Sequence, residues 1–183
     1  MPQLTLTRSM IALAFAFGSS AGTAWAAGKA HEHGALKLDV AIEGNKLTIA
    51  MEAPLDNLLG FERAPRTNAE RQAATDVLAR LRSPDKGVPL FAADAAAQCT
   101  LSKSDVQAPV LEPGAQPAAK DGHADLDASY EFACAIPGEL RTLDVGLFEA
   151  FKRTQRIDVQ VAGPKGQAKV TLRRPARKVQ LTR

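Results

Sequence analysis

Aromatic side chains and a large excess of either charge are both missing from this sequence. Aromatic residues make up 5% of the 183 residues, with one Trp and one Tyr, which argues against a binding face built from aromatic rings. The 23 Lys and Arg against 20 Asp and Glu give a net charge of +3 at pH 7. That charge is too small to indicate nucleic acid or an anionic membrane as a partner. Because 45% of the residues are hydrophobic, we expect a globular protein with a core.

The motifs of common enzyme classes are also absent from the sequence. It contains no Gly-x-Ser-x-Gly elbow, no His-Glu-x-x-His metalloprotease motif and no phosphate-binding P-loop. No Cys-x-x-Cys pair occurs, and no cysteine follows the apolar N-terminal run where a lipid anchor would need one. We therefore predict that the protein is not an enzyme.

The N-terminus has the three parts of a secretion signal. Arg8 supplies a positive charge, residues 10–17 form a short apolar run, and residues 24–26 fit a cleavage site. The run is well short of the roughly 20 residues that a membrane-spanning helix needs, although an uncleaved anchor is the alternative interpretation. We predict that residues 1–26 are removed and that residues 27–183 form one periplasmic domain without a membrane span.

Export changes how the two cysteines are interpreted. In an oxidising compartment, Cys99 and Cys134 most simply form one disulfide, because only one pairing is available. Closing a loop of this length would stabilise the fold by about 3–4 kcal/mol in the chain-entropy model. A reactive thiol or a thiolate metal ligand is the alternative role for either cysteine.

Two secondary-structure elements follow clearly from residue spacing. Apolar residues alternate with polar or small ones on both sides of Gly44-Asn45, so residues 35–52 are predicted to form a β-hairpin. Thr67 and Glu70 have the spacing of a capping box, and Pro84 is a helix stop. A helix is therefore predicted over residues 67–82.

The later part of the chain predicts more hairpins around one insertion. Apolar alternation returns over residues 126–135, 157–161 and 170–172, with a last short strand around residues 179–181. Residues 108–122 are rich in Pro, Ala, Gly and Gln, which predicts a flexible insertion within the domain. The pattern predicts an α+β fold, with a mostly antiparallel sheet of β-hairpins and one main helix packed on a face.

The three histidines are the candidate metal ligands. His31 and His33 are two residues apart, so in an extended chain both imidazoles point the same way and can reach one ion. His123, near Asp121 and Asp125, would complete the site if the fold brings it close. Imidazole and carboxylate ligands favour zinc, although Cu²⁺ and Ni²⁺ also accept them. The alternative is that these histidines are simply solvated.

Two carboxylates occupy similar places in the sequence. Glu62 and Glu149 each follow an apolar stretch that contains a glycine. Each of these stretches comes after a predicted hairpin, and a histidine precedes each hairpin. The echo indicates either a remnant of duplication or chance. We interpret the two carboxylates as surface or loop-capping residues rather than as a catalytic pair.

A series of short motifs resembles a known family. The motifs are His31-Glu32-His33-Gly34, Gly60-Phe61-Glu62-Arg63-Ala64-Pro65, Gln98-Cys99, Tyr130-Glu131-Phe132-Ala133-Cys134, Leu147-Phe148-Glu149-Ala150-Phe151 and Gly166-Gln167. In this order they resemble the ZrgA-like family of secreted proteins from Gram-negative bacteria, over nearly all of the mature chain. The resemblance implies a periplasmic zinc-binding protein of zinc uptake, not an enzyme. An ABC-type metal importer is the partner that it implies.

One segment departs from that family pattern. The zinc-binding members carry a middle segment rich in His, Asp and Glu, whereas residues 108–125 here are mostly Ala, Pro and Gly around His123. The resemblance therefore implies one modest zinc site rather than a high-capacity one. The alternative function is a secreted protein-interaction module, docking a partner through the edge of the first hairpin or through residues 54–65, which are predicted to be irregular.

Overall fold

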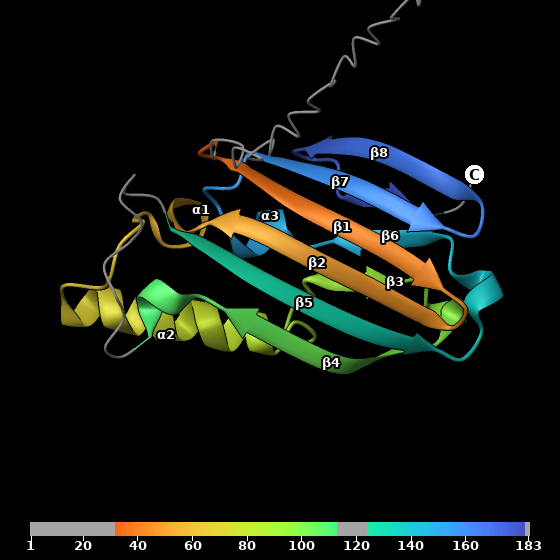
Figure 1. Ribbon diagram of the computed structural model, residues 1–183, viewed down its shortest axis with the longest axis horizontal. Coiled ribbons are helices and arrows are strands. Elements are labelled where there is room, and N and C mark those ends of the chain that lie inside the picture. The colour runs from red at the N-terminus through yellow and green to blue at the C-terminus, as the bar shows by residue number, and fades with distance from the viewer. Residues whose placement is uncertain (1–31, 113–123, 182–183) are drawn as a thin grey trace, which may run out of the picture.

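A curved six-stranded sheet forms the frame of the computed structural model, which describes residues 32–112 and 124–181 (Figure 1). Its strands lie in the order β4-β5-β2-β1-β7-β8. Their bounds are β4 (Cys99–Gln107), β5 (Asp125–Cys134), β2 (Lys46–Pro54), β1 (Ala35–Glu43), β7 (Arg156–Gly163) and β8 (Gly166–Arg173). Neighbouring strands run antiparallel except for β1 and β7, which are parallel.

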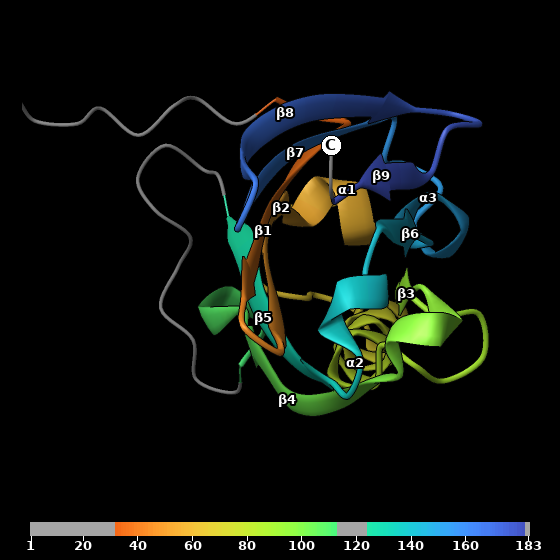
Figure 2. The same cartoon turned by 90° about the vertical axis from the view of Figure 1, so that its right-hand side faces the viewer.

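A second, smaller layer covers the concave side of this sheet. It contains the three-stranded sheet β3-β6-β9 and the helices α1, α2 and α3, as the end-on view shows (Figure 2). The bounds are β3 (Phe91–Ala93), β6 (Thr142–Val145), β9 (Lys178–Gln180), α1 (Leu55–Leu59), α2 (Asn68–Arg82) and α3 (Leu147–Ala150). The hydrophobic core lies between the two layers, and the alternating buried residues of β1, β2, β5 and β7 supply much of it.

The predicted hairpin of residues 35–52 is confirmed as β1 and β2. Leu36, Leu38 and Val40 are buried while the residues between them face outward, which is the period-two pattern of a sheet with one covered face. The strands pair from Lys37↔Glu52 to Glu43↔Lys46. Gly44 turns between them with φ +59°, a value that a residue without Cβ adopts at no steric cost.

The predicted helix over residues 67–82 is confirmed as α2, with Thr67 as its N-cap. The Thr67 hydroxyl accepts from the Glu70 N–H at 3.1 Å, and the Glu70 carboxylate accepts from the Thr67 N–H at 3.3 Å, completing the capping box. Hydrogen bonds from Arg63 and from backbone N–H groups lower the pKa of Glu70 to about 2. The helix buries Ala74 and Leu81 and lies on the concave side of the sheet (Figure 2).

The predicted disulfide is also confirmed. Cys99 begins β4 and Cys134 ends β5, and the two residues are direct partners across this strand pair. Their sulfur atoms are 2.03 Å apart. The bond therefore joins an edge strand to its neighbour, and neither cysteine is available as a thiolate ligand.

Three features differ from the sequence-based expectation. The parallel β1–β7 pair and the separate sheet β3-β6-β9 were not predicted, because local alternation shows that a segment is a strand but not which strand it pairs with. Residues 54–65 were predicted to be irregular, yet they contain α1. The predicted insertion of residues 108–122 is not wholly flexible, because Ala108 and Val110 are buried in the core.

Several sequence predictions lie outside the described residues. They are the signal peptide (residues 1–26), most of the insertion, His31, Asp121 and His123. Among the residues that the structure describes, no helix is long and apolar enough to cross a membrane.

Candidate metal centre

His33 lies in a tight turn that leads into β1. The N–H of Ala35 donates to the carbonyl of Glu32 at 3.0 Å, and Gly34 has φ +83°. A positive φ at the third position of such a turn defines the type II geometry, which requires a residue like Gly there. His33 therefore occupies the corner of the turn, and its side chain projects from the end of the sheet.

The His33 ring faces a carboxylate from another segment. The distance from His33 Nε2 to Glu62 Oε1 is 3.2 Å, and the side chains are 56% and 11% exposed, respectively. A half-exposed imidazole thus lies against a largely buried carboxylate. The two residues are 29 positions apart in sequence (62 − 33), so the fold, not the local chain, creates the pair.

Glu62 is held between two helices. It follows α1 after Gly60, which ends that helix with φ +83°. The next residue, Arg63, donates two hydrogen bonds to the Glu70 carboxylate, at 3.0 and 2.8 Å, in the first turn of α2. The Arg63 guanidinium also lies 5.0 Å from the centre of the Phe61 ring. The residues on both sides of Glu62 are therefore fixed.

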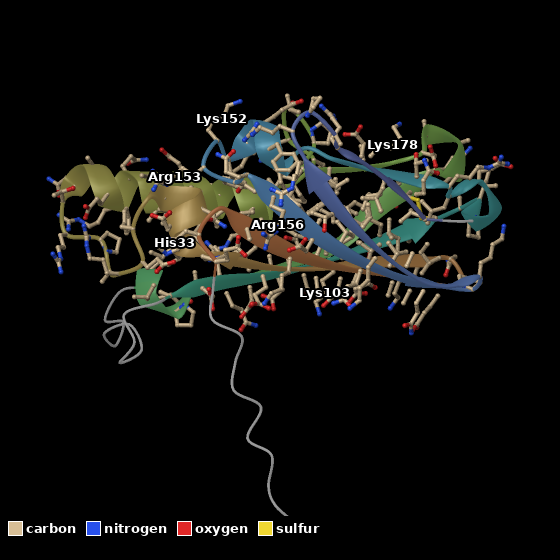
Figure 3. The ribbon with its side chains drawn as sticks, turned by 90° about the horizontal axis from the view of Figure 1, so that it is seen from above. His33, Lys103, Lys152, Arg153, Arg156 and Lys178 are labelled. Atoms are coloured by element: carbon tan, nitrogen blue, oxygen red, sulfur yellow. A yellow bond between two sulfur atoms is a disulfide. The ribbon has the colours of Figure 1, made fainter. Side chains whose placement is uncertain are left out.

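Helix α1 is hydrogen-bonded to the loop before β7 through its second residue, Asp56. Arg153 donates to the carbonyl of Asp56 at 2.8 Å and to both of its carboxylate oxygens, at 3.0 and 3.1 Å. A Cβ on Gly60 would lie 3.5 Å from the same guanidinium, which is ordinary van der Waals contact, so the φ of +83° rather than crowding favours glycine there. Figure 3 shows Arg153 at the same end of the molecule as His33.

The carboxylate that precedes His33 already has a strong partner. Glu32 accepts from two nitrogen atoms of Arg156, at 2.8 and 2.7 Å, and Arg156 also donates to Asp158 at 2.9 Å. The hydrogen bonds from Arg156, together with its charge, lower the pKa of Glu32. Glu32 therefore anchors the turn to β7, and Glu62 is the carboxylate that faces the imidazole.

The start of β5 lies at this same end of the sheet. Asp125 is the first residue of β5 and pairs with Pro54, and the carbonyl of Ala124 accepts from the N–H of Leu55 at 2.9 Å. Since β2 separates β1 from β5, their backbones are about 10 Å apart across the sheet. The chain positions that follow His123 are thus attached to α1, close to the turn that carries His33.

The predicted ligands are therefore brought together in part. His33 and Asp125 lie at one end of the sheet, while His31, Asp121 and His123 lie outside the described residues. Within residues 32–112 and 124–181, no group of three or more His, Cys, Asp and Glu is placed to hold a metal ion. These residues provide a pair of candidate metal ligands, His33 and Glu62.

The two carboxylates of the sequence echo have different surroundings. Glu149, in α3, has a side chain that is 48% exposed and pairs with Arg177, as a surface carboxylate does. Glu62 is largely buried and faces His33, so it is not a surface carboxylate as Glu149 is. No signal near Glu62 in the sequence announces this, because its partner comes from the turn before β1.

The fold and this corner define a class: a two-layer α+β protein with one disulfide and a histidine–carboxylate pair at one end of its larger sheet. The comparison with protein families then gives the particular family. A model described as "ZrgA family zinc uptake protein" matches residues 30–181. The chain belongs to the ZrgA family. A comparison with curated proteins finds no match.

Proposed function

We propose that this chain is a periplasmic zinc-binding accessory protein of a zinc-uptake system and that it is not a catalyst. Membership of a family described by zinc uptake supports the zinc-related role. The observation that carries the proposal is the His33–Glu62 pair, which joins an imidazole and a carboxylate from two fixed segments. Zinc is the cargo in this proposal, and an ABC-type metal importer is the partner to which it would be delivered.

The spacing of the two donor atoms suits zinc. Tetrahedral zinc with Zn–N and Zn–O bonds of about 2.0–2.2 Å places two ligand atoms about 3.3–3.5 Å apart. His33 Nε2 and Glu62 Oε1 are 3.2 Å apart, so an ion could bind both after a movement of a few tenths of an ångström. Cu²⁺ and Ni²⁺ accept the same donors, and we propose zinc because of the family.

Two donors alone make a weak site, so further ligands are part of the proposal. His31 comes two residues before His33 in the sequence, and His123 comes two residues before Asp125. Asp125 itself begins β5, at the same end of the sheet as His33. We propose these two histidines as the remaining protein ligands. A site of this kind would release zinc below about pH 6, where imidazoles become protonated and lose the lone pair that binds the ion.

Calorimetric titration with zinc tests the proposed function. The mature wild-type protein should bind about one equivalent at pH 7.5, and His31→Ala/His33→Ala should bind at least about tenfold more weakly. His123→Ala reports separately on the third histidine. The proposal fails if the wild type and the double variant bind zinc equally poorly.

The alternative function, a protein-interaction module, could not use the edge of the first hairpin, because β7 and β5 pair with both edges of β1–β2. Residues 54–65 stay a predicted docking segment. The observation that favours this alternative is the outer face of the larger sheet. Two hollows of about 290 and 440 Å³ adjoin there and share Asp39 and Ala50. Unchanged zinc binding in all histidine variants would favour it.

A further inference from the structure

We infer that Asn57 is the positioning residue of the metal centre, because it fixes the His33 turn to the helix that leads to Glu62. This inference rests on the proposed function. Asn57 lies in the middle of α1 and is 1% exposed, and it is one of two buried polar residues among those that the structure describes. A buried amide costs free energy unless it is hydrogen-bonded, so its contacts identify its role.

Both ends of the Asn57 amide bind the backbone of the turn. Its oxygen Oδ1 accepts from the N–H of Gly34 at 2.6 Å, and its nitrogen Nδ2 donates to the carbonyl of Ala35 at 2.6 Å. These are the two residues directly after His33. An amide that both donates and accepts fixes the turn in orientation as well as in distance, which a single hydrogen bond would not do.

The other side of the turn is fixed by β7, so the turn is gripped from two directions. The carbonyl of Gly34 accepts from the N–H of Gln155 at 2.8 Å and from the N–H of Arg156 at 2.9 Å. These contacts hold the turn to the sheet, whereas Asn57 holds it to α1. Asn57 thus links the backbone next to His33 to the helix from which Glu62 follows.

The short path from Asn57 to Glu62 makes that link effective. Glu62 comes five positions after Asn57 (62 − 57), and this path includes the Gly60 turn that Arg153 flanks. Asn57 and Arg153 therefore hold the segment that leads to Glu62 from two sides, and this fixes the position of Glu62 relative to His33. The 3.2 Å distance between their donor atoms is the result, and a free turn would not maintain it.

Asp94 provides a matched control elsewhere in the fold. Its carboxylate accepts from the N–H groups of Arg141 and Thr142, at 2.8 and 2.5 Å, so it also ties backbone across a long sequence separation. Arg141 lines a hollow together with Ile42 and Gly44, at the other end of β1 from His33. Asp94→Ala therefore removes a similar structural contact without touching the metal centre.

The test compares Asn57→Ala with Asp94→Ala in the full mature chain by two measurements. In zinc-free protein, NMR contacts between the His33 ring and the Glu62 side chain should be present in the wild type and in Asp94→Ala, and lost in Asn57→Ala. In zinc titrations, Asn57→Ala should bind about tenfold more weakly, as outer-shell changes do, and Asp94→Ala should stay within about twofold of the wild type.

The outcomes separate this inference from the proposed function. If the His33–Glu62 contacts persist in folded Asn57→Ala, the positioning role of Asn57 is overturned, whatever the zinc affinity of the variant. A wild type that shows the contacts but binds no zinc defeats the proposed function, while loss of the contacts in the variant still supports Asn57. If Asn57→Ala does not fold, Asn57→Ser takes its place, because a single hydroxyl cannot bridge Gly34 N–H and Ala35 C=O as the amide does.

Discussion

The two ends of β1 both turn at a glycine with positive φ, but their surroundings differ completely. Gly44, with φ +59°, has nothing within 4 Å of the position where a Cβ would lie. Gly34, with φ +83°, lies 3.4 Å from Gln155 by the same measure, and its backbone hydrogen-bonds to Asn57, Gln155 and Arg156. One turn only reverses the chain, whereas the other is fixed from several sides and carries a histidine. Turn geometry alone therefore does not make a metal site, whereas ligand side chains held in place by several contacts can.

The largest expected effect is a loss of stability on removal of the disulfide, which should leave the His33 end of the sheet intact. The disulfide joins Cys99 to the last residue of β5, at the opposite end of that strand from Asp125, and it closes a 35-residue separation. Cys99→Ser/Cys134→Ser should lower the free energy of unfolding by about 3–4 kcal/mol in denaturant titrations. At temperatures where the variant is folded, zinc affinity should stay within about twofold of the wild type. Loss of zinc binding in the folded variant would contradict the separation of the two ends.

The two glycines of β1 give the next test. Gly34→Ala and Gly44→Ala each force a Cβ into the left-handed region, which costs about 1–2 kcal/mol of stability in thermal unfolding. Only Gly34→Ala should also weaken zinc binding, because it disturbs the turn that carries His33. Equal zinc affinities for the two variants would show that the rigidity of the His33 turn is unimportant for binding.

The two echoed carboxylates give a test of the ligand itself. Glu62→Gln should weaken zinc binding by about tenfold, or about 1.4 kcal/mol, because the amide nitrogen does not bind the ion. Glu149→Gln, at the carboxylate that pairs with Arg177, should leave zinc affinity unchanged. A zinc titration in which both variants match the wild type would remove Glu62 from the proposed site.

The smallest expected effect concerns the support of Glu62 through Arg63 and Glu70. The folded state holds the pKa of Glu70 at about 2, against an ordinary value of 4.5, so its ionised form stabilises the fold above about pH 4.5. This contribution is lost as the pH falls from about 4.5 towards about 2. Glu70→Gln should therefore melt slightly below the wild type at pH 7, and the difference should vanish near pH 2. A constant difference across this pH range would contradict the assignment.

Much of the fold could be predicted from local spacing. The alternation through Leu36, Leu38 and Val40 places β1, and the Thr67–Glu70 capping box places the start of α2. The cysteine pairing could be predicted because the sequence holds two cysteines, which allow one pairing. These features depend on residues close in sequence or on a count, and so they need no knowledge of strand order.

The candidate site could be predicted only in part. The histidine pair and its position before the first strand are visible in the sequence, but Glu62 and Asn57 gain their roles from contacts across 29 and 23 positions. The sequence-based expectation for residues 54–65 also missed α1, a helix of five residues that has no side-chain cap. Such a short helix has too few turns to produce a periodic pattern, and it is stabilised by tertiary contacts instead.

Zinc-edge anomalous diffraction from crystals of the mature protein soaked with zinc tests the central claim most directly. We expect an anomalous peak about 2.0–2.1 Å from His33 Nε2, with a Glu62 carboxylate oxygen as a second ligand. Zinc bound away from both side chains, with the His33–Glu62 pair undisturbed, would contradict it.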